Sequence, residues 1–122
     1  MSTPPSASNE NDLPDALPLA PESMIRRLSL ELASFGSNQA AVEAWYERSL
    51  TRFREIIYQQ SARPLIEELA RNAAQYQANG ETPEGTEAYR AASMDVIALK
   101  VLAAAQRSLS EAMHRARTLL GG

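Results

Sequence analysis

His114 is the single histidine of this 122-residue chain, and the chain has no cysteine. Acid–base chemistry by a histidine needs a partner that orients the ring, and thiolate chemistry needs a cysteine. Neither accompanies His114. Instead, Arg115 and Arg117 flank it near the end of a long stretch of helical period, where cations complement the negative end of the helix dipole. The sequence therefore predicts a structural role for His114, no thiol nucleophile and no cysteine-ligated metal.

Two pairs of glutamates are the other candidates for chemistry. Glu43 and Glu47 lie four residues apart and share a helix face, whereas Glu67 and Glu68 point in different directions around a helix. Neither pair has a histidine to complete a metal-ligand set. The chain also lacks a glycine-rich phosphate loop, a serine elbow and a zincin motif. We therefore expect no enzyme activity, no metal and no cofactor, and interpret these glutamates as solvated helix faces.

A group of arginines beside aromatic residues raises the question of nucleic-acid binding. Arg48, Arg52 and Arg54 follow Trp45 and Tyr46 closely. The glutamates of the same segment are Glu43, Glu47 and Glu55. They cancel most of the positive field, and the whole chain carries a formal net charge of −3. The pattern favours a salt-bridged helix face, so we expect no nucleic-acid partner.

The chain ends on Gly121 and Gly122 after two leucines, an ending similar to the conjugation tails of ubiquitin-like proteins. Those tails follow a β-grasp fold, whereas every periodic segment here has the period of a helix. Glycines after a helix ordinarily end it. The sequence thus predicts that the glycines end the helix. We expect a functional role for Leu119 and Leu120 and none for the glycines.

Composition divides the chain into an arm and one helical domain. Residues 1–20 are rich in proline, serine and acids, which predicts a disordered acidic arm, and residues 21–122 form the predicted helical domain. The N-terminus lacks the basic region and apolar run of a cleaved secretory signal. No segment approaches the roughly 20 apolar residues that a membrane span requires. We expect neither a cleaved signal nor a membrane span.

The first predicted helices follow the arm directly. A short amphipathic helix runs from Pro21, a good first helical residue, to Gly36, a good helix stop. Either Ser37 or Asn38 then caps a second helix. Its apolar face contains Val42, Trp45, Tyr46, Phe53, Ile56 and Ile57.

Two further signals divide the rest of the chain. Pro64 predicts a kink or a break in the second helix, with Ser61 or Ala62 as a new cap. The sequence NGETPEG at 79–85 predicts a turn, because Thr82 before Pro83 is typical of a helix start. The predicted fold is therefore all-α: an antiparallel hairpin of a short helix, a proline-kinked helix and a long final helix.

The final helix has no breaker before Gly121, and apolar residues recur along it at spacings of three and four. This predicted seam contains Tyr89, Ala92, Val96, Leu99, Ala103, Gln106, Leu109, Met113, Ala116 and Leu120. Between residues 94 and 105 the helix is apolar on most sides, which indicates neighbours on several sides. Either the preceding helices or other subunits would supply them.

These patterns predict non-catalytic assembly through the final helix, with protein partners that are like or related subunits. The predicted interface is Val96, Leu99, Leu102, Leu109, Met113, Leu119 and Leu120. The alternative is a small cytoplasmic adaptor or export chaperone whose short helix, residues 24–35, folds onto a partner protein.

The layout resembles the inner-rod proteins of bacterial type III secretion systems, which are relatives of the needle subunits. The matching pieces are residues 1–20, the turn at 79–85 and the final helix, whose Thr118, Leu119 and Leu120 are similar to the Thr-Leu-Leu ending of some members. Segment 45–58 has no counterpart there. The resemblance implies an uncleaved export region, a cytoplasmic location before export, and a subunit that packs helically beneath the needle.

Overall fold

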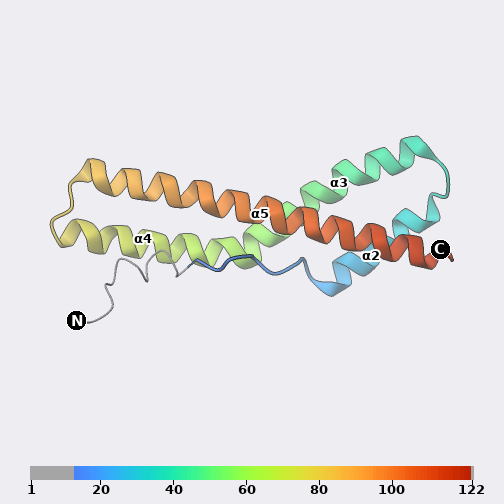
Figure 1. The fold of residues 1–122 in the computed structure, drawn as a ribbon, viewed down its shortest axis with the longest axis horizontal. Helices are drawn as coiled ribbons and strands as arrows, with labels where there is room; N and C mark the ends of the chain where they lie inside the picture. The colour runs from blue at the N-terminus through green and yellow to red at the C-terminus, as the bar shows by residue number, and fades with distance from the viewer. Residues whose placement is uncertain (1–12, 122) are drawn as a thin grey trace.

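The computed structural model describes residues 13–121, and within them the fold is all-α (Figure 1). Its helices are α2 (Glu22–Ser34), α3 (Gln39–Ile57), a π-helical turn η1 (Tyr58–Ala62), α4 (Arg63–Ala78) and α5 (Pro83–Leu119). Helix α5 runs the length of the rod, and α2, α3 and α4 pack along it. The predicted antiparallel helical hairpin is confirmed.

Helix α2 begins and ends as its flanking residues predict. Pro21 occupies the N-cap position, Glu22 lies in the positive first turn, and Gly36 adopts a left-handed conformation with φ of 61°. The buried face of α2 contains Ile25 and Leu28. This face packs against α5, which places the short helix beside the last third of the long one.

Helices α3 and α4 form one continuous bent unit. Asn38 caps α3, because its side-chain Oδ1 accepts a hydrogen bond from the Ala41 amide at 3.1 Å. Before Pro64 the chain widens into η1, where the Arg63 amide bonds the carbonyl of Tyr58, five residues earlier. Figure 1 shows α3 and α4 leaving this point in different directions. The predicted kink is therefore present.

Ala62, one of the two predicted cap residues, occupies the N-cap position of α4, but its backbone is helical. Helical hydrogen bonding passes through both positions, and no side chain caps the start of α4. A break is unnecessary because the π turn already rearranges the bonds at the point where Pro64 lacks an N–H. The bend is thus made within an unbroken helix.

The hairpin turn also follows the sequence prediction. Thr82 caps α5 by accepting a hydrogen bond from the Gly85 amide at 3.0 Å, and Pro83 takes the first helical position. Gly80, with φ of 103°, supplies the left-handed residue that lets the chain reverse. Helix α5 then continues for 37 residues without interruption.

The core lies between one face of α5 and the three preceding helices. Small residues dominate the α5 side, and large side chains fill the core from the other helices. The buried α5 residues are Thr86, Ile97, Val101, Ala104, Ala105, Ser108, Leu109, Ala112 and Ala116. Trp45 and Phe53 of α3 are the largest side chains that meet them, and the Trp45 indole N–H also donates to the Leu28 carbonyl of α2 at 3.0 Å.

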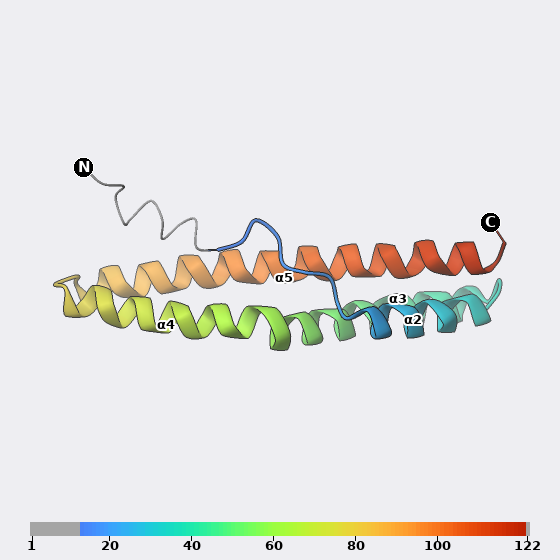
Figure 2. The ribbon, with the colours of Figure 1, turned by 90° about the horizontal axis from the view of Figure 1, so that it is seen from below.

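The segment before α2 corrects the sequence prediction. Residues 1–12 of the predicted disordered arm lie outside the described residues, but residues 13–20 form an extended strap that crosses α5 (Figure 2). Leu17 and Ala20 are buried in the main core, and Leu13 packs against it. The prediction of an arm to residue 20 was wrong for this part, because alternating prolines and apolar residues have no helical period to reveal burial.

One buried hydrogen bond fixes the strap to α5. The Ala20 amide donates to the Ser108 hydroxyl at 2.9 Å, and that hydroxyl donates in turn to the Ala104 carbonyl at 2.8 Å. Ser108 has no exposed surface, so water cannot replace either bond.

Two cations on α5 reinforce the strap at the surface. Arg107 donates to the Leu17 carbonyl at 2.9 Å, and Lys100 donates to the Asp15 carbonyl at 3.0 Å. Both bonds end on backbone oxygens, which every residue type supplies. The strap is therefore held by its shape and backbone as well as by its apolar side chains.

We predict that Ser108→Ala destabilises the protein by about 1–3 kcal/mol, because it leaves the buried Ala20 amide without an acceptor. Urea unfolding followed by circular dichroism measures this loss, and hydrogen exchange at Ala20 should become faster. Ser110→Ala, at an exposed position two residues on, is the matched control and should have no comparable effect. Equal stability of the two variants would contradict the anchoring role.

Candidate interaction surface

The structure divides the predicted assembly residues into three groups. Leu109 is only 2% exposed, and the chain's own helices enclose it. Leu102 and Met113 are partly buried, and Met113 packs against the core. The remaining four face outward: Val96 is 40% exposed, Leu99 67%, Leu119 54% and Leu120 63%. Only these last four offer substantial apolar surface to a partner.

The drift of the predicted seam around α5 explains this division. The seam keeps nearly a 3.5-residue repeat, whereas an α-helix has 3.6 residues per turn, so the pattern rotates around the helix by about 20° per heptad. A step of two consecutive threes, from Ala103 through Gln106 to Leu109, turns it further. Val96 and Leu99 therefore lie outside, while Leu109 lies inside. The chain's own helices therefore cover one side of α5, and the other side stays open.

We call Val96 and Leu99, with the exposed Ala103, the outer patch. Asp15, Lys100 and Arg107 border it, where the strap crosses the helix. Leu99 is 67% exposed outside the packed face of α5, so the patch offers apolar surface that the chain's own helices leave uncovered. This patch is the first candidate surface for a partner.

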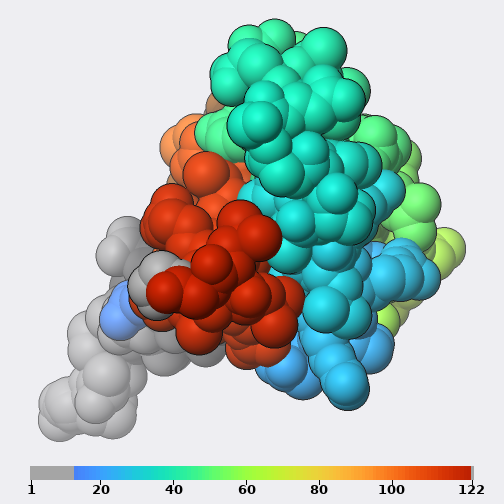
Figure 3. All heavy atoms as spheres, turned by 90° about the vertical axis from the view of Figure 1, so that its right-hand side faces the viewer, coloured from blue at the N-terminus to red at the C-terminus, as the bar shows by residue number. Residues whose placement is uncertain are grey.

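We call Leu119 and Leu120 the tip of α5. Leu119 continues the buried stripe of Ala112 and Ala116 at spacings of four and three, but it is exposed. Figure 3 looks at this end of the rod, where the last turns of α5 stand at the surface beside α2 and α3. The tip thus follows the buried stripe of α5 in sequence but is exposed to solvent.

An open groove of about 570 Å³ lies between α4 and α5 on the half of the rod that carries the turn. We call it the α4–α5 groove. Its walls are mainly apolar, and Tyr76 and Tyr89 meet edge to face across it with ring centres 4.8 Å apart. The other lining residues are Leu13, Asp15, Leu65, Glu68, Leu69, Asn72, Ala92, Ser93, Val96, Ile97 and Lys100. The groove ends where Leu13 of the strap enters it.

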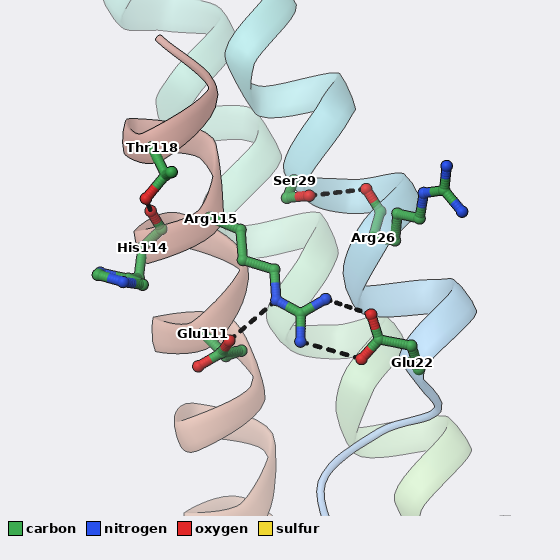
Figure 4. A network of polar contacts seen from close by, with 7 residues as sticks. All are labelled: Glu22, Arg26, Ser29, Glu111, His114, Arg115 and Thr118. Atoms are coloured by element: carbon green, nitrogen blue, oxygen red, sulfur yellow. Dashed lines mark hydrogen bonds and ion pairs between the residues drawn. The ribbon is translucent and has the colours of Figure 1, made fainter. Parts of the chain in front are cut away.

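The residues considered for chemistry do not gather into a site. The His114 side chain is exposed and points away from the neighbouring polar contacts in Figure 4. Glu43, Glu47, Glu67 and Glu68 are exposed along α3 and α4. Between residues 13 and 121, no three histidine or acidic side chains lie close enough together to hold a metal ion.

The arginines and aromatic residues of α3 do not form a shared binding surface. Trp45 is 1% exposed, so its ring cannot stack on a base. Arg48 pairs with Glu31 of α2 at 2.9 Å, as expected for a salt-bridged face. These contacts tie α3 to α2.

Arg115 joins the two ends of the described chain through a polar cluster (Figure 4). Both of its terminal nitrogens donate to the carboxylate of Glu22 in the first turn of α2, and its Nε donates to Glu111 at 2.9 Å. The hydrogen bond from Arg115 is the main cause that lowers the pKa of Glu22 below its ordinary value. The same contacts raise the pKa of Arg115. Sequence reasoning placed Arg115 at the helix dipole and missed the contact with Glu22, which is 93 residues away.

Comparisons with known proteins do not assign this surface. No family model, no curated protein and no solved structure matches the chain. Among residues 13–121, no helix has a stretch that is both long and apolar enough to cross a membrane. The outer patch, the tip and the groove are therefore the candidate interaction surfaces of this chain.

We predict that the Glu22–Arg115 pair makes stability depend on pH in acid. Because folding lowers the pKa of Glu22, the pair stabilises the fold above the ordinary value near 4.5, and this contribution is lost as the pH falls through the lowered value. Glu22→Gln should reduce the difference between urea midpoints measured near pH 7 and near pH 3. Glu47→Gln, at an exposed site on α3, is the control. An unchanged difference in Glu22→Gln would contradict the assignment.

Proposed function

We propose that this protein is a non-catalytic helical assembly subunit whose partners are like or related subunits. The observation that carries the proposal is the division of α5 into a packed inner face and an exposed apolar outer patch and tip. Leu99, Leu119 and Leu120 are each more than half exposed, so their apolar surface stays in contact with water in an isolated monomer. Burial between subunits would remove this surface from water.

The size of the effect favours many weak contacts over one strong pair. Fully burying a leucine side chain contributes about 1.5–3 kcal/mol, and a stable interface usually buries more than about 1,000 Å² in total. The outer patch alone is smaller than this. Several surfaces along the rod would have to act together, as they do when each subunit contacts more than one neighbour.

The finer form of the proposal is an inner-rod component of a bacterial type III secretion apparatus, present in the cytoplasm before export. The arm, the turn and the Thr118–Leu119–Leu120 ending support it through their resemblance to that family. The exposed tip supports it because the resemblance assigns assembly to the last helix. The adaptor alternative has less support, since α5 already covers Ile25 and Leu28, the apolar residues that residues 24–35 would offer to a partner.

We predict that Leu99→Asp leaves the helix content unchanged but weakens self-association at least tenfold, because it places a charge in the outer patch. Sedimentation velocity across a concentration series measures the association. Ala91→Asp, an exposed change on α5 outside the patch, is the charge control and should assemble normally.

Ile97→Asp gives the contrast within the same helix. Ile97 is 1% exposed, so an unpaired charge there should destabilise the fold by about 3–5 kcal/mol. A wild-type chain that remains a folded monomer at every concentration would contradict the proposed function.

Export is tested separately from assembly. We predict that deleting residues 2–12 abolishes secretion through a type III apparatus while helicity and urea midpoint stay unchanged, because the strap begins after this segment. Deleting residues 2–20 would also remove Leu17 and Ala20 from the core, so it would not separate an effect on export from an effect on stability. Undiminished secretion of the shorter deletion would count against the export role.

A further inference from the structure

Charge is distributed unevenly along the rod. Residues 64–95, which form the half with the turn, contain six acidic and two basic residues. The other half, residues 22–63 and 96–121, contains ten basic and six acidic residues. Figure 1 shows these two groups at opposite ends of the rod. The molecule is therefore acidic at the turn end and basic at the end that carries the tip.

Each end also presents an apolar feature. The acidic half contains most of the α4–α5 groove, whose charged lining residues are Asp15, Glu68 and Lys100. The basic half ends in the tip, where Arg117 and Leu120 are exposed together in the last turn of α5. The rod thus carries an apolar tip at its basic end and a mainly apolar groove in its acidic half.

We infer that a second copy of this chain docks head to tail, with the tip of one copy seated in the α4–α5 groove of the next. This inference rests on the proposed function and names the surfaces through which like subunits meet. Leu119 and Leu120 supply the apolar contact, and the opposite charges of the two ends orient the encounter. The two surfaces differ, so the contact is heterologous and can repeat into a ring or a helical filament.

A contact of the outer patch with its own copy would behave differently. Such a contact is symmetric and closes at a dimer, and it brings ends of like charge together when the rods run parallel. The net negative charge of residues 64–95 also disfavours nucleic acid as the occupant of the groove. Charge complementarity therefore favours a second copy in the head-to-tail arrangement.

Two variants separate the two surfaces. Ala92→Arg places a long cationic side chain at the groove, at an exposed position where arginine suits the helix. Leu119→Ser combined with Leu120→Ser removes the tip at two exposed positions. Each variant alone should self-associate at least tenfold more weakly than the unchanged chain, as measured by sedimentation velocity of the full chain.

Mixing the two variants is the decisive experiment. The groove variant keeps an intact tip, and the tip variant keeps an intact groove, so an equimolar mixture should form a one-to-one complex through a single tip-to-groove contact that cannot repeat. Ala91→Arg, one residue outside the groove, should assemble like the unchanged chain. Association of the unchanged chain should also weaken as salt rises.

The outcomes distinguish this inference from the proposed function. If the unchanged chain assembles but the mixture stays monomeric, or if Ala91→Arg loses as much as Ala92→Arg, the tip-to-groove geometry is overturned and the assembly function stands. If the unchanged chain never assembles, both are overturned.

Discussion

The fold depends on one buried face of α5. That face is built mainly from small residues, among them Ala104, Ala105, Ser108 and Ala112, which let other helices and the strap approach its backbone closely. Large side chains such as Trp45 and Phe53 then fill the core from the opposite side. Small residues bury little apolar area each, so α5 contributes a surface of contact more than hydrophobic energy. Every other element is held in place by packing against that surface.

This arrangement leaves one side of a long helix without partners. A helix of 37 residues is longer than α2 or α4 alone can cover, and the bend after α3 directs the chain along only one side of it. The strap crosses part of the open side and ends at the groove. The outer patch and the tip remain exposed, so the candidate surface results from the geometry of the core.

Local signals made the helices predictable, and contacts distant in sequence remained hidden. Gly36, Asn38 and Thr82 mark helix ends through hydrogen bonds and conformations that depend on near neighbours. The strap could not be predicted this way, since its backbone groups bond side chains of α5 that lie 85 to 90 residues later in the sequence. The predicted seam placed Val96, Leu99 and Leu109 on one face. Its slow rotation around α5 leaves Val96 and Leu99 outside and carries Leu109 into the core.

The π turn before Pro64 determines the rotational phase of α4. In a regular α-helix each residue adds about 100°, so Leu69 and Ala73 would lie almost opposite to Phe53 and Ile57. The wider turn holds one additional residue, as the five-residue step from Ile57 to Ala62 in the buried pattern records. It thereby rotates α4 back by nearly the angle of one residue, toward α5. A single additional residue thus lets the buried faces of α3 and α4 both point toward α5.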